Sequence, residues 1–436
     1  MKKIGSVVIY GKGKAMKSVC ELLEHFQISY TQMDDTDADQ AVIKKSKIII
    51  ATPGIKPSHR LYTTHGKKIM SELSFVGKLI NDGYITWRNN IQLIGITGTN
   101  GKSTTTRVLY QACKLLEEKK ELSDRKNVYI GGNFDLPLSG ILLDIMREKK
   151  TEQHSIIILE ASSFMLWKLQ HLKFSVGVLL NIAQDHIDRH GSMKDYLQSK
   201  LNILVYADSA ITISEIKENV LKDQMRGISL LHRLRPFWWQ TNRPINRLNY
   251  GALPDFHHPL FLGSHNAYNF GAVDMVLQQL YGDYDHDILQ QIQPVAHRLQ
   301  PILLTGGVTI IDDSVSSSAH ALGAALESMQ GPIVLISGGY DNGENYSSLI
   351  EKIADKVKVA IFYGQTRVHL YPLAKQVVTD TFMVETLQEA MKLAGEEAKK
   401  HHLNTILYSP GAKSFDQFEN VYERIATFEK LVEEYR

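Results

Sequence analysis

The sequence predicts an α/β protein of three domains, in which largely parallel sheets are covered by helices. Short apolar segments alternate with longer stretches of helical periodicity along the 436 residues of the chain. Several of these apolar segments are continuous, as expected for strands that are buried on both faces of a parallel sheet. The length exceeds that of one ordinary domain, and 43% hydrophobic residues suffice for several packed cores.

The alternation of strands and helices gives the order of the elements. The predicted strands are Ser6–Tyr10, Lys47–Thr52, Gln92–Thr97, Ser155–Glu160, Val176–Asn181, Ala210–Ser214, Thr309–Asp312, Ile333–Ser337, Val357–Tyr363 and Thr405–Tyr408. Helical patterns separate most of them, for example at Thr104–Glu118, Ala319–Ser328 and Leu387–Lys399. This alternation favours α/β domains with parallel sheets. We place the domains at residues 1–89, 90–294 and 295–436, with breaks near Trp87–Asn90 and Gln293–Pro294.

Composition excludes several classes of protein. The net charge of +2 shows no basic footprint for nucleic acid. The two cysteines, Cys20 and Cys113, lie in apolar helical contexts and do not form a disulfide framework. No apolar run approaches the roughly 18 residues of a membrane span, and the short N-terminal run reads as a strand rather than a signal peptide. We therefore expect a cytoplasmic protein with no nucleic acid partner and no membrane insertion.

The segment "GITGTNGKST", Gly95 to Thr104, is typical of a phosphate-binding loop between a strand and a helix. It departs from the pattern G-x-x-x-x-G-K-[ST], because Ile96 stands where the first glycine belongs. Glycines still let backbone N–H groups approach an anion, and the following helix adds its positive N-terminal end. Lys102 is placed to reach phosphates, and the hydroxyl of Ser103 or Thr104 to bind Mg²⁺. The alternative is a plain glycine-rich turn.

Two further segments follow apolar strands, whose carboxyl ends face the ligand crevice of a parallel sheet. Glu160 ends one strand and is a candidate ligand of nucleotide-bound Mg²⁺; alternatively it points at water. After the next strand, Asp185 to His190 crowd a short loop in which His186 is a candidate metal ligand or phosphate contact. In the plain interpretation, Asp188 and Arg189 are surface charges, and Lys200 is a solvated residue of the next helix.

As an ordered set, these motifs resemble the Mur ligase family of ATP-dependent, amide-forming enzymes. The set comprises "TGTNGKST", "GGN" at Gly131–Asn133, "LEASSF" at Leu159–Phe164, "DHIDRHGSMKDYLQSK" at Asp185–Lys200, "GSHNAYN" at Gly263–Asn269, "AHRLQ" at Ala296–Gln300, "DDS" at Asp312–Ser314 and "SPGAKSFDQF" at Ser409–Phe418. It covers nearly the whole chain and is most similar to the members that add D-glutamate to UDP-N-acetylmuramoyl-L-alanine. The resemblance implies a Rossmann-like N-terminal domain, a central P-loop ATPase-type parallel sheet and a C-terminal Rossmann-like α/β domain.

The resemblance also implies roles in binding ATP and Mg²⁺. The loop would contribute Gly98, Thr99, Asn100, Gly101, Lys102, Ser103 and Thr104. Asn266 and Asn269 would contact adenine. Arg298 would contact the phosphate chain, and Asp313 would contact the ribose. The catalytic residues would be Lys102, Glu160, His186 and Lys200, and the metal ligands Ser103, Glu160, His186 and Lys200. Lys200 matches a lysine that the family modifies with CO₂ to a carbamate, which would turn a cation into an anion.

The same resemblance assigns the substrate contacts. Lys14 and Ala15, in "YGKGKAM", would bind the UDP pyrophosphate, while "TPGI" at Thr52–Ile55 resembles a second nucleotide loop. The remaining contacts would be Asp34 and Asp35 to uracil, Asn133 and Ser162 to the muramoyl group, and Ser317, Lys413 and Ser414 to the amino acid.

The amino-acid site departs from the pattern of the family. Val315 and Asn342 stand where lysines or other basic residues are expected, Ser317 replaces a threonine, and Val421 replaces an aromatic residue. Lys413 is a candidate replacement cation, or else an ordinary surface lysine. Met165 likewise replaces a glutamine on the muramoyl side.

Three hypotheses follow. The first is a monomeric ligase acting on UDP-N-acetylmuramoyl-L-alanine and glutamate, with ATP and Mg²⁺, through an acyl phosphate in peptidoglycan precursor synthesis. The second is a relative that adds a different amino acid, and the third is a nucleotide-binding regulator without catalysis. A folylpolyglutamate synthase is disfavoured, because an additional unit precedes the phosphate-binding loop.

Overall fold

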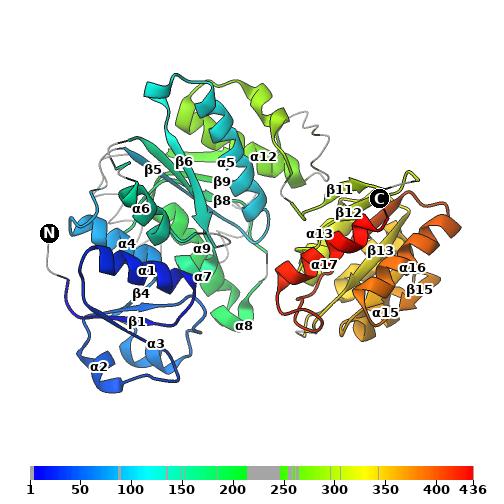
Figure 1. Ribbon diagram of the computed structural model, residues 1–436, viewed down its shortest axis with the longest axis horizontal. Helices are drawn as coiled ribbons and strands as arrows, with labels where there is room; N and C mark the ends of the chain where they lie inside the picture. Colours follow the sequence, from blue (N-terminus) through cyan, green and yellow to red (C-terminus); the bar gives the residue numbers. More distant parts are fainter. Residues whose placement is uncertain are drawn as a thin grey trace. The chain divides into compact units, whose positions relative to one another are not determined.

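The computed structural model of the chain contains three β-sheets with helices packed around them (Figure 1). It describes residues 4–86, 90–133, 136–148, 150–151, 153–183, 185–213, 246–253, 258, 261, 265–294, 296–304, 306–341 and 343–435. By their internal contacts the residues form a first unit, Met1–Pro254 with Tyr268–Ile292, and a second unit, Asp255–Ala267 with Gln293–Arg436. The predicted domain boundaries near residues 90 and 295 stay predictions.

The first sheet is parallel, with the strand order β2-β1-β3-β4. Its strands are β1 (Val7–Tyr10), β2 (Tyr30–Met33), β3 (Ile48–Ala51) and β4 (Ile69–Met70), and its helices are α1 (Lys14–His25), α2 (Gln40–Lys45), α3 (Arg60–His65) and α4 (Glu72–Asn81). The central strands β1 and β3 are buried along their whole length, as their unbroken apolar sequences require. Helices α1 and α4 also contact α6 of the second sheet, which joins the two sheets within the first unit.

The second sheet is also parallel and has the order β10-β9-β8-β5-β7-β6. Its strands are β5 (Ile91–Thr97), β6 (Asn127–Gly132), β7 (Ser155–Glu160), β8 (Phe174–Leu179), β9 (Ala207–Ile213) and β10 (Asn246–Tyr250). Its helices are α5 (Lys102–Glu118), α6 (Leu138–Arg147), α7 (Ser163–Leu166), α8 (Ile187–His190), α9 (Met193–Val205) and α12 (His265–Tyr281), with 3₁₀ turns at Leu122–Asp124 and His286–Gln291. The strands are parallel and adjacent, so the loops that follow β5, β6, β7 and β8 open at one edge.

The third sheet has the order β11-β12-β16-β13-β14-β15 and is parallel except for β11. Its strands are β11 (Gln300–Leu303), β12 (Thr309–Asp312), β13 (Ile333–Gly338), β14 (Val357–Tyr363), β15 (Asp380–Met383) and β16 (Thr405–Tyr408). Its helices are α13 (Ala319–Glu327), α14 (Ile350–Lys356), α15 (Arg367–Ala374), α16 (Leu387–Lys400) and α17 (Val421–Glu433), with a 3₁₀ turn at Ser347–Leu349.

Alternation along β13 shows how both faces of this sheet are buried. Val334 and Ile336 pack in one apolar cluster with residues of α16 and α17. Ile333 and Leu335 pack in a second cluster with residues of α13, α14 and α15. A strand with helices on both sides explains why this segment reads as one continuous apolar run. The α/β class with parallel sheets is therefore confirmed.

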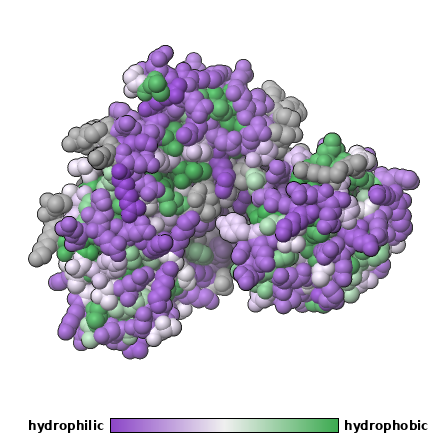
Figure 2. All heavy atoms as spheres, viewed as in Figure 1, coloured by the Kyte–Doolittle hydropathy of each residue, from purple (hydrophilic) through white to green (hydrophobic). Residues whose placement is uncertain are grey.

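The exterior is largely polar on the face shown in Figure 2, where apolar residues form small separate areas. Within the part of the chain that the structure describes, no helix combines the length and apolar character needed to cross a membrane.

Candidate functional site

The loop between β5 and α5 has a shape that only glycine permits at Gly101. Its backbone has a φ of 78°, in the left-handed region. A Cβ atom at this position would lie 2.4 Å from Oδ1 of Asn269 in α12, closer than any non-bonded contact allows. Asn269 is 6% exposed and accepts a hydrogen bond from the hydroxyl of Thr105, with 3.3 Å between the oxygens. Asn269 therefore supports the loop, and Asn266, three residues earlier in α12, is also buried.

Two lysines converge on the backbone of this loop. Nζ of Lys102 donates to the carbonyl oxygens of Gly98 and Thr99 over 2.9 and 2.8 Å. Nζ of Lys200, in α9, donates to the same Gly98 oxygen over 2.6 Å and lies above the ring of Tyr196. Lys200 is 2% exposed, so the interpretation as a solvated helix residue is wrong.

The environment of Lys200 favours a neutral amine. Burial, and next the charge of Lys102, lower the pKa of Lys200 well below its ordinary value. A neutral amine carries a lone pair, and this is the form of lysine that reacts with electrophiles such as CO₂.

Glu160, at the end of β7, is also turned inward. It is 2% exposed, which rules out a carboxylate directed at water. Its Oε2 accepts a hydrogen bond of 2.5 Å from the hydroxyl of Ser103, and its Oε1 accepts one of 3.0 Å from the amide of Asn133. The hydroxyl and carboxylate oxygens brought together here are the ligand types that Mg²⁺ prefers. Among the described residues, no group of three or more His, Cys, Asp or Glu side chains is arranged to hold a metal ion.

A tyrosine links this loop to the segment that contains His186. The hydroxyl of Tyr196 lies 3.0 Å from Oγ1 of Thr99, which in turn accepts a hydrogen bond from the backbone N–H of Ala183. Burial raises the pKa of Tyr196 to about 12, so the phenol stays protonated. His186 packs between the rings of Tyr196 and Phe164, with centroid distances of 6.3 and 4.9 Å. Sequence patterns gave no signal for Tyr196, because its partners come from separate loops.

The backbone at His186 is unusual. Its φ of 52° lies in the left-handed region, which residues other than glycine rarely adopt. The ring is held beside a carboxylate, with 3.3 Å between His186 Nε2 and Asp185 Oδ2. Such a conformation persists only where the surrounding structure fixes it, which marks this position as a candidate for function.

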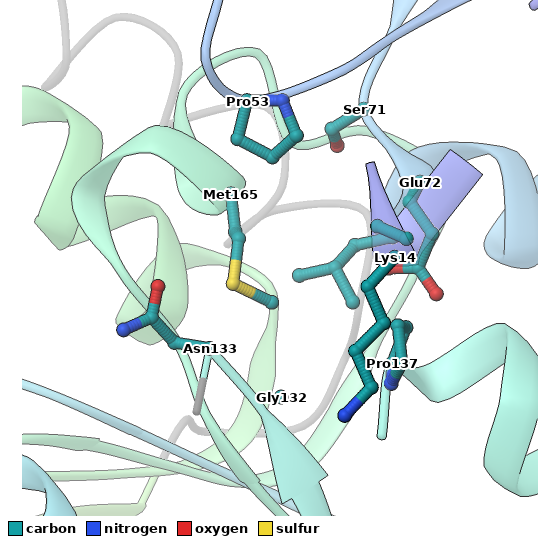
Figure 3. Close-up of a pocket in the computed structure, with 10 residues that line it drawn as sticks. Lys14, Pro53, Ser71, Glu72, Gly132, Asn133, Pro137 and Met165 are labelled. Carbon is teal, nitrogen blue, oxygen red and sulfur yellow. The ribbon is translucent and has the colours of Figure 1, made fainter. Parts of the chain in front are cut away.

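A pocket of about 130 Å³ lies where the first and second sheets meet within the first unit (Figure 3). Lys14 and Pro53 line it from the first sheet, and Asn133 and Met165 line it from the second. In the close-up, the Met165 side chain lies between those of Lys14 and Asn133 (Figure 3). Lys14, Ala15 and Asn133, three predicted substrate contacts, therefore share one pocket.

A buried carboxylate joins the two sheets beside this pocket. Glu72 is the first residue of α4, is 4% exposed, and accepts a hydrogen bond of 2.6 Å from the backbone N–H of Ser139 in the first turn of α6. Its carboxylate thus lies at the N-terminal ends of two helices, where negative charge is stabilised. Burial nevertheless raises its pKa. Sequence patterns did not single out Glu72.

The other predicted nucleotide-sugar residues lie outside this pocket lining. Asp34 pairs with Lys12 over 2.7 Å, and Asp35 contacts the hydroxyl of Tyr10 over 2.6 Å and His59 over 3.0 Å. Both aspartates follow β2, at the carboxyl edge of the first sheet.

Ser162 has a structural contact of its own. It caps α7, accepting a hydrogen bond of 3.3 Å from the N–H of Met165.

Arg189 contradicts its interpretation as a surface charge. Its guanidinium group donates to the backbone carbonyl oxygen of Gly54 over 2.6 Å and to that of Pro53. The group also lies 4.6 Å from the centroid of the Phe164 ring. The partners are backbone atoms about a third of the chain away, so no sequence pattern indicated them.

In the second unit, Asp313 lies buried after β12. Its carboxylate accepts a hydrogen bond of 2.7 Å from the hydroxyl of Ser409, which follows β16. Burial raises the pKa of Asp313 to about 7, although Ser409 and the charge of Arg298 act in the opposite direction. Arg298 itself is exposed.

The loops after β12 and β16, which carry the predicted amino-acid contacts, are joined by Arg424 of α17. This side chain is 1% exposed and donates to the carbonyl oxygens of Ser314 and Ser316 on one loop and Ala412 on the other.

The predicted amino-acid contacts differ in exposure. Ser317 and Lys413 are exposed on these loops, whereas Ser414 is 3% exposed. Val315 is half-buried, and Asn342 lies outside the described residues.

Comparison with known proteins finds similarity to Mur ligases. Residues 96–229 match the model of the Mur ligase middle domain. The chain is 29% identical to the UDP-N-acetylmuramoylalanine--D-glutamate ligase of Aquifex aeolicus, over 98% of both chains, and 28% identical to that of Thermotoga maritima, over 94% and 89%.

Solved structures agree at the level of the fold. The MurF ligase of Thermotoga maritima, solved in complex with ADP, superposes with a TM-score of 0.59 at 16% identity over 100% and 96% of the two chains. The UDP-N-acetylmuramate-alanine ligase of the same organism gives 0.54 at 14% identity over 98% and 99%. The chain is thus similar to Mur ligases in its middle domain and, at moderate identity, over nearly its whole length, and its fold is that of the solved Mur ligases.

Proposed function

We propose that this protein is an ATP-dependent ligase that joins D-glutamate to UDP-N-acetylmuramoyl-L-alanine in the synthesis of peptidoglycan precursors. The observation that carries the proposal is the convergence of Lys102, Ser103, Glu160 and Lys200 on one glycine-rich loop. The name shared by the curated relatives, which the chain matches over nearly its whole length, supports D-glutamate as the acceptor rather than another amino acid.

The chemistry explains why these groups are needed together. A carboxylate is a poor electrophile, so the carboxylate of the alanyl group is first converted with ATP into an acyl phosphate. The amine of glutamate then attacks the carbonyl carbon, and phosphate leaves. Negative charge develops on oxygen in both steps, and fixed cations and oriented N–H groups stabilise it.

The phosphate-binding loop supplies the contacts to ATP. The residues from Gly98 to Thr104 bind the phosphates through backbone N–H groups and through the amine of Lys102. Asn266 and Asn269 lie on the adenine side, while Arg298 and Asp313 of the second unit contact the phosphate chain and the ribose.

The donor set fits Mg²⁺. Ser103 and Glu160 would hold the first ion, and His186 would contact a second. Bound there, Mg²⁺ supplies positive charge that neutralises the phosphate oxygens.

Lys200 becomes an anionic ligand in this scheme. Its neutral amine attacks the carbon of CO₂, a proton leaves the nitrogen, and a carbamate results. The buried position and the lowered pKa of Lys200 support this modification. The carbamate of Lys200 would then be a further anionic ligand for Mg²⁺.

Two further sites complete the proposal. Lys14, Ala15, Asn133 and Ser162 bind the diphosphate and muramoyl groups, and Asp34 and Asp35 bind uracil. On the second unit, Ser317, Lys413 and Ser414 bind glutamate, with Lys413 supplying the cation that Val315 does not.

Phosphate release tests the function directly. Purified protein receives ATP, Mg²⁺ and UDP-N-acetylmuramoyl-L-alanine together with D-glutamate, L-glutamate or another D- or L-amino acid. We expect release with D-glutamate and none when the nucleotide sugar is omitted. Phosphate release with a different amino acid alone, or no phosphate release with any amino acid of the panel, would contradict the proposal.

Location and assembly complete the proposed picture. The ligase acts in the cytoplasm as a monomer, with domains at residues 1–89, 90–294 and 295–436. Light scattering and limited proteolysis test the last two points.

A further inference from the structure

Arg189 touches both sides of the boundary between the first and second sheets. It belongs to α8, after β8 of the second sheet, whereas the carbonyl oxygens of Pro53 and Gly54 follow β3 of the first sheet. Its guanidinium plane is also close enough to the Phe164 ring, at 4.6 Å, for a cation–π contact. One planar side chain therefore fixes a backbone loop and an aromatic ring at the same time.

One of the groups that Arg189 holds lines the substrate pocket, and the other is next to a residue that does. Pro53 lines the pocket from the first sheet, and Met165, the neighbour of Phe164 in α7, lines it from the second. Figure 3 shows the Pro53 ring and the Met165 side chain facing the same space. A change in the position of Arg189 would therefore change the separation of Pro53 and Met165.

Arg189 is also tied to the segment that carries His186. The helix α8 has only four residues and is bounded by left-handed backbone at His186, with φ of 52°, and at Gly191, with φ of 81°. The backbone N–H of Arg189 donates to the carbonyl oxygen of His186 over 3.1 Å. The loop at the metal side and the pocket wall are therefore connected through a single turn.

We propose that Arg189 is a positioning residue that sets the width of the pocket for the UDP-muramoyl substrate by clamping the loop after β3 against α7. The inference rests on the proposed function for the identity of the substrate. Its role is distinct from that of Lys14 or Asn133, because Arg189 acts through Pro53 and Phe164 rather than by lining the pocket.

The test compares Arg189→Ala and Arg189→Lys with Arg147→Ala. Arg147 is a matched control, because it also joins the two sheets, from α6 to Glu21 of α1, but through an exposed ion pair of 3.5 Å away from the pocket lining. For Arg189→Ala we expect the KM for UDP-N-acetylmuramoyl-L-alanine to rise about tenfold, since charged hydrogen bonds to the loop are lost. The kcat and the KM for ATP should stay unchanged.

Arg189→Lys should give an intermediate KM, because an ammonium keeps the charge but cannot span both carbonyl groups in one plane. An unchanged KM in Arg189→Ala, an equal rise in Arg147→Ala, or a loss confined to kcat would each overturn the proposal.

A second measurement separates this inference from the proposed function. Hydrogen exchange of the free protein should speed up at the amides of Gly54 and Ile55 in Arg189→Ala but not in Arg147→Ala. If the wild-type protein shows no ligase activity, the proposed function fails. The role of Arg189 in holding the loop after β3 against α7 is then still tested by the exchange rates and by calorimetric measurement of UDP-N-acetylmuramoyl-L-alanine binding. Equal exchange in both variants and in the wild type would exclude this role.

Discussion

Lys102 and Lys200 donate hydrogen bonds to the same carbonyl oxygen, that of Gly98, over 2.9 and 2.6 Å. Two ammonium groups so close together would repel each other strongly in a buried site. The repulsion is reduced because burial lowers the pKa of Lys200 and so favours its neutral amine, whereas Lys102 is only half-buried. Lys102 is therefore suited to binding phosphate as a cation, and Lys200 is suited to covalent modification as a neutral amine.

The first prediction concerns the modification of Lys200. Protein exposed to isotope-labelled bicarbonate should show a carbamate signal by NMR, and Lys200→Ala should lack it and lose most of its ligase activity. Lys194→Ala, an exposed position on the same helix, serves as the control. A carbamate signal that persists in Lys200→Ala would place the modification elsewhere.

Metal dependence tests the contact between Ser103 and Glu160. Ser103→Ala removes a hydroxyl ligand, and we expect the Mg²⁺ concentration for half-maximal phosphate release to rise roughly tenfold. Glu160→Gln, which removes the negative charge, should raise it further. Ser123→Ala, at an exposed 3₁₀ turn, should leave it unchanged. Identical Mg²⁺ curves for all three variants would remove both residues from the metal site.

The buried carboxyl of Asp313 predicts a pH-dependent stability. Its pKa in the folded protein, about 7, lies above the ordinary value of 3.8, so the folded state holds the proton more tightly than the unfolded state. The stability from this group is complete below pH 3.8 and is lost as the pH rises through about 7.

Asp313→Asn keeps an acceptor for Ser409 but has no proton to lose. The melting temperature of this variant should therefore rise relative to that of the wild type as the pH is raised from about 5 to about 8, a range that spans this pKa. Asp355→Asn, on the exposed side of α14, should show no such trend. A constant difference across this range would contradict the assignment.

The strands that the sequence predicts, and those it misses, follow from position in the sheets. Ser155–Glu160 and Val357–Tyr363 match β7 and β14 residue for residue, because interior strands are continuous apolar runs. Every strand without a prediction lies at the end of a sheet, namely β2, β4, β6, β10, β11 and β15. Edge strands have one unpaired side, and polar residues or glycines interrupt their apolar runs, as in YTQM of β2, NVYIGG of β6 and NRLNY of β10.

The candidate site divides in a similar way. Lys102, Ser103 and Glu160 sit in compact motifs that have a physical signature in the sequence. Arg189 and Tyr196 do not, because their partners are backbone or hydroxyl groups that only folding brings near. Local pattern therefore predicts the groups that touch phosphate, and three-dimensional structure is needed for those that hold them in place.

The last prediction concerns the amino-acid pocket. Lys413 is exposed beside the buried Ser414, on a loop whose backbone is fixed by the N–H of Tyr340 and by Arg424. Lys413→Ala should raise the KM for D-glutamate about tenfold, as expected for the loss of one charge-assisted hydrogen bond. Lys392→Ala, on the exposed face of α16, should have no effect. An unchanged KM in Lys413→Ala would mean that another cation binds the carboxylate.

The two buried thiols make this protein convenient for optical experiments. Cys20 is 7% exposed and Cys113 is fully buried, and burial raises the pKa of both, to about 12 for Cys113. Maleimide dyes react with thiolates, so both native cysteines will label slowly. A Lys44→Cys, Lys392→Cys variant, with one new thiol on each unit, would accept a donor and an acceptor dye without removal of the native cysteines. Energy transfer between the two dyes would then report in real time whether ATP or the nucleotide sugar alters the signal.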